Sequence, residues 1–161
     1  EIIYRNPILL PREFFIMSAS AQCIFCKIIR GEMSAIKVYE DEHTLSFMDV
    51  QPASPGHTLV VAKTHAPNLL DIAEADLLVV TVSTQRIARA VQQALVPDGI
   101  RINQFNGAAA GQTVLHYHVH IMPIWEGRRV SAHEHAPTDL DELRALAARI
   151  RNAMRRVNAT F

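Results

Sequence analysis

The chain has little cysteine, no excess of either charge and no long apolar run. Only two cysteines, Cys23 and Cys26, occur among 161 residues, which excludes a framework of several disulfides. Lys+Arg and Asp+Glu both total 16, so no net positive field attracts a polyanion or an anionic membrane. With 49% hydrophobic and 20% charged residues, the composition is that of one compact domain. We therefore expect a cytoplasmic protein without a nucleic-acid or membrane partner.

The first sixteen residues lack the order of segments that makes a signal peptide, and they are too short to span a bilayer. Their one apolar run, Ile8-Leu9-Leu10, is interrupted by Pro11. The sequence Met17-Ser18-Ala19-Ser20 reads like a natural start. We expect residues 1–16 to be a non-native or mis-assigned leader, and residues 17–161 to form one domain that ends in a helix.

Apolar periodicity and turn residues predict three helices and about five strands. A short helix is expected from Cys23, with Gly31 just after it, and longer helices over residues 74–96 and 139 to about 157. The strands are expected over residues 38–39, 44–50, 57–62, 100–105 and 114–122. This order of elements favours an α+β fold, with an antiparallel sheet of about five strands and segregated helices.

Three histidines alternate along the last predicted strand. Side chains two residues apart share one face of a strand, so His116, His118 and His120 should form a row with neighbours about 6.5–7 Å apart. Imidazole can act as a nucleophile, a proton carrier near neutral pH or a metal ligand. One such histidine is often a satisfied core residue, but three in register indicate a site. The opposite face should hold four apolar residues: Leu115, Tyr117, Val119 and Ile121.

A turn with the sequence Gly111-Gln112-Thr113 comes directly before the histidine row. Its backbone N–H groups, an amide and a hydroxyl could form an anion-binding nest. A glycine-containing loop alone is weak support for such a site. Its position beside the histidines makes a bound phosphate the favoured interpretation.

These features resemble the histidine-triad (HIT) family, and in particular the bacterial Hint-like branch that carries an N-terminal Cys-x-x-Cys. The signature of the family, His-x-His-x-His followed by two apolar residues, reads here His116-Tyr117-His118-Val119-His120-Ile121-Met122. The resemblance extends over residues 23–123 through further motifs: residues 23–32, Phe47-Met48-Asp49-Val50, residues 55–61, Lys63-Thr64-His65 and Asn106-Gly107.

The resemblance implies a fold, a reaction and a site. It implies a two-fold homodimer that binds purine nucleoside monophosphates and cleaves phosphoramidates or acyl-phosphate anhydrides. His118 would attack the α-phosphorus and form a nucleotidyl-histidine, while His120 and Asn106 would help to neutralise the phosphoryl oxygens. His116 and His65 would form an adjacent proton or metal network. The implied substrate-binding residues are Asn106, Gly111, Gln112, Thr113, Asp49 for the ribose, and Ile24, Phe25, Ile28, Phe47 and Val50 around the base.

Several of these assignments have structural alternatives. Asp49 could simply begin a turn, Phe25 and Phe47 could be core residues, and Asn106 could be a left-handed turn residue before Gly107. Thr113 stands where members of the family often carry Ser, and the apolar loop at residues 108–110 leaves the preferred leaving group open. Four other histidines are expected to be surface or structural residues and are left outside the site: His43, His57, His133 and His135.

The pair Cys23 and Cys26 has three interpretations. The cysteines could be ordinary small buried residues, while a redox motif would need a βαβ context that is absent. A structural zinc site would need two further ligands. The resemblance supplies them as His65 and His116, so we expect a structural zinc ion held by Cys23, Cys26, His65 and His116.

Two other function classes stay open. His-x-His on a strand is also typical of a zinc metallohydrolase, although the triad strand contains no carboxylate. A nucleotide-binding interaction protein without a catalytic role would retain the same residues. For assembly, the apolar surface of the helix at 74–96 and the strand at 100–105 favours a homodimer.

Overall fold

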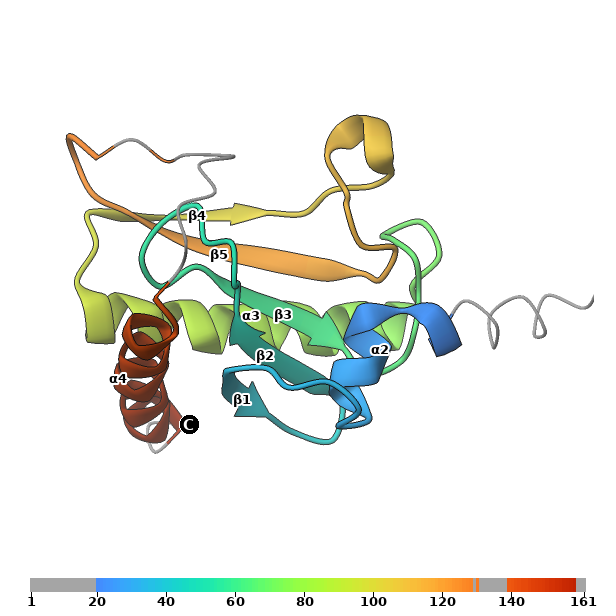
Figure 1. Ribbon diagram of the computed structural model, residues 1–161, viewed down its shortest axis with the longest axis horizontal. Helices are drawn as coiled ribbons and strands as arrows, with labels where there is room; N and C mark the ends of the chain where they lie inside the picture. The colour runs from blue at the N-terminus through green and yellow to red at the C-terminus, as the bar shows by residue number, and fades with distance from the viewer. Residues whose placement is uncertain (1–19, 129, 131–138, 159–161) are drawn as a thin grey trace, which may run out of the picture.

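The computed structural model describes residues 20–128, 130 and 139–158, and these form a five-stranded antiparallel sheet in the order β1-β2-β3-β5-β4 (Figure 1). The predicted α+β class and strand number are confirmed. The strands are β1 (Lys37–Glu40), β2 (Thr44–Met48), β3 (Thr58–Ala62), β4 (Gly99–Asn103) and β5 (His118–Ile124). The helices are α2 (Ile24–Ile29), α3 (Glu74–Leu95) and α4 (Leu140–Asn158), and a short 3-10 turn, η1, covers Ala108–Ala110.

Helices cover both faces of the sheet, which explains why β2 and β3 are buried along their whole length. Figure 1 shows α3 behind the sheet, α4 beside it, and α2 on the front. Val60 and Ala62 of β3 belong to the apolar cluster that includes α3 and α4. Leu59 and Val61 point the other way, into a smaller cluster with α2. The strand period of two therefore divides the core between the two faces.

The long helix α3 presents an apolar stripe to the sheet and ends close to the β2–β3 turn. Glu74 and Asp76 lie in its first turn, where acidic groups favour the helix dipole. At its other end, Leu95 packs onto the backbone of Gly56, which has a φ of 86°. A Cβ atom on Gly56 would lie 2.3 Å from the Leu95 Cδ1 atom, so both the conformation and the contact require glycine.

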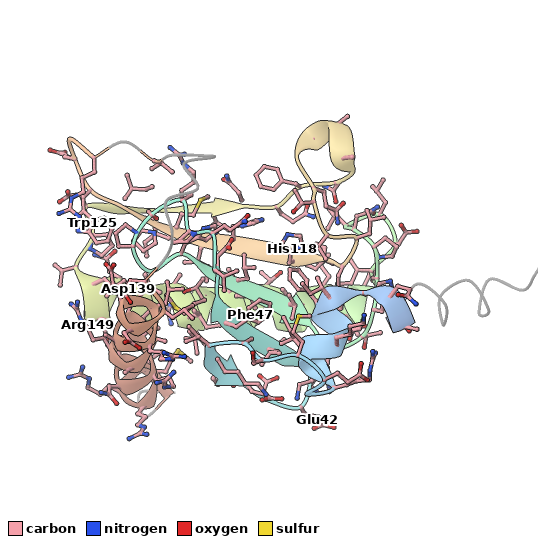
Figure 2. All side chains as sticks on the ribbon, viewed as in Figure 1. Glu42, Phe47, His118, Trp125, Asp139 and Arg149 are labelled. Carbon is pink, nitrogen blue, oxygen red and sulfur yellow. The ribbon has the colours of Figure 1, made fainter. Side chains whose placement is uncertain are left out.

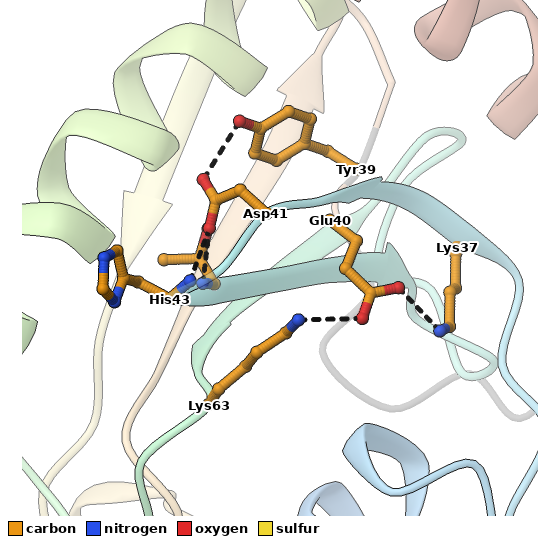
Figure 3. Close-up of polar contacts among 7 residues, drawn as sticks. Lys37, Tyr39, Glu40, Asp41, His43 and Lys63 are labelled. Atoms are coloured by element: carbon orange, nitrogen blue, oxygen red, sulfur yellow. Dashed lines mark hydrogen bonds and ion pairs between the residues drawn. The ribbon is translucent and has the colours of Figure 1, made fainter.

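The turn between β1 and β2 is organised by one carboxylate (Figure 3). Asp41 accepts hydrogen bonds from the backbone N–H groups of His43 and Thr44 and from the Tyr39 hydroxyl. These contacts lower the pKa of Asp41, although burial opposes the change and is the largest single influence on it. Beside this turn, Glu40 pairs with Lys37 and Lys63 at 2.7 and 2.9 Å.

The C-terminal helix α4 packs against α3 and β1. Its apolar stripe includes Leu143, Ala147 and Ile150, which join the α3 side of the core. Arg149 donates to the Ala94 carbonyl at 2.7 Å, and Arg151 donates to the Lys37 carbonyl at the same distance. Its first turn is acidic and its last turn is basic, which favours the helix dipole.

Several boundaries differ from the sequence prediction, and β2 and β4 each end two residues earlier than expected, at Met48 and Asn103. The last strand begins at His118 rather than at residue 114, and α3 ends at Leu95 with Val96 as its left-handed cap. Residues 1–16, His133 and His135 lie outside the described residues. Within residues 20–128 and 139–158, no helix is long and apolar enough to cross a membrane.

Candidate functional site

The histidine row is bent between its first and second members. His118 and His120 lie on β5, on the face covered by α2, but His116 precedes the strand. Its N–H donates to the Val114 carbonyl, only two residues back, which turns the chain before β5 begins. The expected continuous row is therefore wrong at this end. Leu115, predicted to lie on the opposite face of the strand, precedes the strand and is 60% exposed.

His118 has a defined tautomer because of a backbone contact. Figure 2 shows it at the end of β5 nearest to α2 and to the loop that carries η1. Its Nδ1 lies 2.6 Å from the carbonyl oxygen of His116, so Nδ1 carries the proton and donates it. The other nitrogen, Nε2, then holds a lone pair. Burial lowers the pKa of His118, which keeps the ring neutral and nucleophilic.

His120 is oriented by His57, a histidine that the sequence did not predict to belong to the site. The Ala53 N–H donates to His57 Nδ1 at 3.1 Å, so the His57 proton lies on Nε2. That Nε2–H donates to His120 Nδ1 at 2.9 Å, which leaves His120 with a proton on its Nε2. His57 is 4% exposed, so it is no surface residue. Burial lowers the pKa of His57 to about 4 and that of His120 to about 3.

Asp49 lies beside this histidine pair. One of its oxygens accepts the Gln51 N–H at 2.8 Å, and the other lies 3.5 Å from His57 Nδ1. The Ala53 N–H already occupies that nitrogen, so this second contact is no hydrogen bond. Burial raises the pKa of Asp49. We call Asp49, His57 and His120 the Asp–His cluster, whose three ligand-type atoms lie within 4.8 Å of one another.

A second group of possible metal ligands lies near the first turn of α2. We call it the Cys–His cluster, and it consists of Cys23, Cys26, His65 and His116. His116 Nδ1 lies 3.4 and 3.5 Å from the Cys23 and Cys26 Sγ atoms, and His65 Nδ1 lies 3.3 Å from Cys26 Sγ. The His116 Nε2–H donates to the Ala62 carbonyl at 2.8 Å, so its Nδ1 lone pair faces the sulfurs. A tetrahedral zinc ion bound by sulfur and nitrogen would separate such ligand pairs by about 3.5 Å. The donor set therefore fits zinc in both chemistry and spacing.

The electrostatics of the Cys–His cluster also fit a cation. Burial, together with the neighbouring Cys23, raises the pKa of the Cys26 thiol to about 12. Burial lowers the pKa of His116 to about 4. The cluster thus holds a neutral imidazole beside the Cys26 thiol, and a divalent ion would favour the thiolate form.

The side-chain amide of Gln112 stabilises the predicted phosphate loop through hydrogen bonds to backbone groups. Its Oε1 accepts the Gly107 N–H at 2.8 Å, and its Nε2 donates to the carbonyls of Pro67 and Val114 at 2.6 and 2.9 Å. The N–H groups of Gly111 and Gln112 are also used inside the loop. Gln112 therefore supports the loop, and its side chain is committed to these contacts.

The donors available to an anion come from the next residues of the loop. Among the described residues, nothing accepts the backbone N–H of Thr113 or of Val114. The Thr113 side chain is exposed, so its hydroxyl can reach a ligand. These groups lie directly before the turn that leads to His116 and His118.

Asn106 joins two loops. Its Oδ1 accepts the Leu69 N–H at 2.9 Å and a Gln104 amide N–H at 3.0 Å, and its Nδ2 donates back to Gln104 Oε1 at 2.8 Å. One Asn106 N–H is left after these contacts. The side chain therefore positions the loop at residues 68–70 in addition to any contact with substrate.

The predicted base-binding residues divide into buried and exposed sets. Phe25, Phe47 and Ile28 are buried in the smaller apolar cluster, and the Phe25 ring meets the rings of Phe47 and His118 edge-on at 5.4 and 5.2 Å. Ile24 and Val50 are 41% and 58% exposed. The first set forms the floor beside the histidines, and the second is accessible to a ligand.

Comparison with known proteins identifies the family. The profile of the HIT domain matches residues 30–127, which is more than half of the chain. The chain belongs to the HIT family. Its HIT domain match contains the three triad histidines, His57 and Asp49, whereas Cys23 and Cys26 precede the match.

Three relatives are similar to this HIT protein. Protein hit of Bacillus subtilis is 36% identical over 143 residues, which cover 83% of this chain and 97% of that protein. A zinc-bound histidine triad family protein of Mycobacterium smegmatis is similar in structure, with a TM-score of 0.79, 36% identity and coverage of 88% and 99% of the two chains. Adenylylsulfatase HINT3 of Arabidopsis thaliana is 40% identical over 101 residues, 63% of this chain and 51% of that protein.

Proposed function

We propose that this HIT protein cleaves purine nucleotide conjugates at the α-phosphorus through a nucleotidyl intermediate on His118. The supporting observation is the 2.6 Å contact between His118 Nδ1 and the His116 carbonyl, which leaves the Nε2 lone pair as the reactive group. Nucleoside phosphoramidates and acyl-adenylates are the proposed substrates.

The reaction has two displacement steps. His118 Nε2 forms a bond to the α-phosphorus while the bond to the leaving group breaks, and the leaving group takes that electron pair and a proton from solvent. Water then attacks the phosphorus, the Nε2–P bond breaks, and its electron pair returns to Nε2. The water releases one proton, so the overall reaction consumes only conjugate and water.

Charge on the phosphoryl oxygens would be met by fixed donors. The free backbone N–H groups of Thr113 and Val114, the Thr113 hydroxyl and the Nε2–H of His120 are the proposed partners. Because His57 donates to His120 Nδ1, the His120 proton is held on Nε2. The remaining N–H of Asn106 is a further candidate.

The nucleoside would bind between Asp49 and the apolar residues of α2. An Asp49 carboxylate oxygen can accept hydrogen bonds from ribose hydroxyls, and Ile24 and Val50 can cover a purine. Phe25, Phe47 and Ile28 form the floor beneath them. A nucleotide bound in this way would have its α-phosphorus near His118.

Zinc is the proposed occupant of the Cys–His cluster. A bound zinc ion would supply a structural cross-link. It would join Cys23, which precedes α2, and Cys26, which lies within α2, to His65 and His116. The chain's own contribution to catalysis there is to hold His116, whose carbonyl orients His118. The Mycobacterium smegmatis relative, named as zinc-bound, supports this assignment.

Two alternative functions are less well supported. The Asp–His cluster has the composition of a hydrolytic metal site, but its His57 Nδ1 and His120 Nδ1 lone pairs already accept internal hydrogen bonds. A metal ion there would have to break both contacts. A purely nucleotide-binding interaction protein does not require the fixed tautomer of His118.

The test is detection of the adduct. The protein is mixed with adenosine 5′-phosphoramidate, quenched in denaturant at alkaline pH because phosphohistidine is acid-labile, and digested for mass spectrometry. We expect an adenylyl group on His118, and His118→Asn should lose turnover by about 10³-fold or more while still binding AMP. His43→Asn, at an exposed histidine, is the matched control. An adduct on another residue, or full activity in His118→Asn, would reject the mechanism.

We also propose that two copies pair through α3 and the edge strand β4. Leu78 and Val82 on α3 and Ile102 on β4 are large apolar residues that are exposed in the single chain. Light scattering at micromolar concentration should give the mass of a dimer, and Leu78→Arg should give a monomer. Ala145→Arg, at an exposed position of α4 outside the proposed interface, should leave the dimer intact.

A further inference from the structure

Phe105 is an aromatic residue that neither apolar cluster of the fold uses. Its ring meets the His120 ring edge-on, with centroids 5.3 Å apart, and its side chain is only partly buried. It also lies over the phosphate loop, because a Cβ atom built on Gly111 would contact Phe105 Cδ1 at 3.8 Å. The Phe105 ring therefore lies next to His120 and the phosphate loop.

The surroundings of His120 indicate which part of a substrate Phe105 would meet. Besides Phe105, two rings flank His120: His118 at 4.9 Å and His57 at 5.2 Å. His118 is the proposed nucleophile, and the His57 side leads to Asp49, the proposed ribose partner. In an in-line displacement the leaving group departs opposite to the nucleophile. Phe105 is the third ring beside His120, and neither the nucleophile nor the ribose partner is assigned to it, so we take its side of His120 as that of the leaving group.

The loops around Phe105 contain no charged side chain other than histidine. Residues 104–118 and 64–70 lack Asp, Glu, Lys and Arg. Hydrogen bonds join these two segments, from Gln112 to the Pro67 carbonyl and from the Leu69 N–H to Asn106. They also expose large apolar side chains, and Leu70 is 85% exposed. An anionic leaving group placed there would lose hydration without gaining a counter-charge.

We propose that Phe105 forms an apolar subsite for the leaving group, so that the chain prefers conjugates with uncharged aromatic or aliphatic groups over anionic ones. This inference rests on the proposed function and specifies the substrate class of the same site. Phe105 acts here as a specificity-determining residue. Its ring supplies contact area to the leaving group and no counter-charge.

The test compares two conjugates of nearly equal shape. Adenosine 5′-phosphoramidates of benzylamine and of 4-carboxybenzylamine differ by one carboxylate that is remote from the reacting bond. We expect kcat/KM to be at least about 10-fold higher for the benzylamine conjugate. Phe105→Ala should reduce that ratio to near one, and Phe105→Lys should reverse it by adding a cation. Phe105→Leu should retain most of the preference, and Leu140→Ala, at an exposed apolar residue of α4, should leave it unchanged.

The outcomes separate this inference from the proposed function. Hydrolysis of both conjugates at equal rates by the wild type would overturn the apolar subsite and leave the adduct mechanism intact. An equal loss for both conjugates in Phe105→Ala would assign Phe105 to the positioning of His120 and would also overturn the subsite. Failure to hydrolyse either conjugate, without an adduct on His118, would overturn the proposed function itself. Adenylyl sulfate and ATP extend the series to anionic leaving groups without a ring.

Discussion

The Cys–His cluster and the Asp–His cluster lie on the same face of the sheet and contain similar side chains, but their protons are arranged differently. In the Cys–His cluster, the Ala62 carbonyl accepts the His116 Nε2–H, and the Nδ1 lone pair is directed at two sulfurs. In the Asp–His cluster, the Ala53 N–H donates to the His57 Nδ1 lone pair, and the His57 Nε2–H donates to His120 Nδ1. The Cys–His cluster therefore presents lone pairs to a metal ion, whereas in the Asp–His cluster the tautomer of His57 determines the tautomer of His120.

This difference shows that the proximity of metal-ligand residues does not define a metal site. Both groups have their ligand-type atoms within 4.8 Å of one another. A backbone carbonyl beside one histidine and a backbone N–H beside the other determine which lone pairs are available. Substitutions in either cluster test this division.

The largest effect should follow removal of the sulfurs. Cys23→Ser combined with Cys26→Ser should reduce bound zinc from about one ion per chain to almost none and should lower stability by about 3 kcal/mol, or Tm by about 10 °C. Elemental analysis of protein purified without chelator and thermal unfolding give the two readouts. Turnover should be reduced but measurable, because the proposed nucleophile is retained.

The matched variant for this experiment is Asp49→Asn, which alters the other cluster. It should leave the zinc content at the wild-type value. Zinc that persists in the double Cys variant and disappears in Asp49→Asn would invert the division between the clusters.

An intermediate effect is expected for His57→Ala. Without the His57 Nε2–H, nothing fixes the proton of His120 on Nε2, so turnover should fall by about 10–100-fold. Zinc content should not change. His57→Gln, which retains an N–H donor, should recover part of the activity. Equal activity in His57→Ala and the wild type would remove His57 from the site again.

The smallest effect concerns acid stability. The pKa of His57 is lowered to about 4 by burial, against 6.5 for an ordinary histidine. Between these values the unfolded chain binds a proton that the folded chain does not, so stability falls as the pH is lowered from 6.5 towards 4. In the double Cys→Ser background, which removes the influence of zinc, His57→Ala should make this fall shallower by about 1 kcal/mol per pH unit. Urea unfolding at several pH values measures the slope, and parallel slopes would contradict the lowered pKa.

The sequence predicted the sheet well where side-chain periodicity and backbone agree. Along β3, residues 58–62 alternate between two apolar clusters, as the period of two requires. The prediction was wrong at residues 114–117, where the same alternation continues although the backbone has turned. The bond from the His116 N–H to the Val114 carbonyl is a local backbone choice that no side-chain pattern reveals.

His57 and Gln112 show why parts of the site could not be predicted. Leu59 pairs with His120 across β3 and β5, which brings residue 57 onto the histidine face next to His120. That strand pairing is not present in the local sequence, although the position of His57 beside a turn that begins at Asp49 was a usable signal. The Gln112 amide has the chemistry of a ligand donor, but it contacts Gly107 and Val114 of its own loop and the Pro67 carbonyl of another segment.

The carbonyl oxygen of residue 116 orients His118, and this atom is common to every amino acid. No substitution at residue 116 removes this carbonyl oxygen. A mutation can therefore change the tautomer of His118 only by moving the peptide unit that carries the oxygen. The side chain of residue 116, anchored among Cys23, Cys26 and Ala62, sets that displacement. Lineages that lose the cysteines would therefore need a different anchor for this peptide, and its identity can be sought in any homologue with a single substitution at either cysteine.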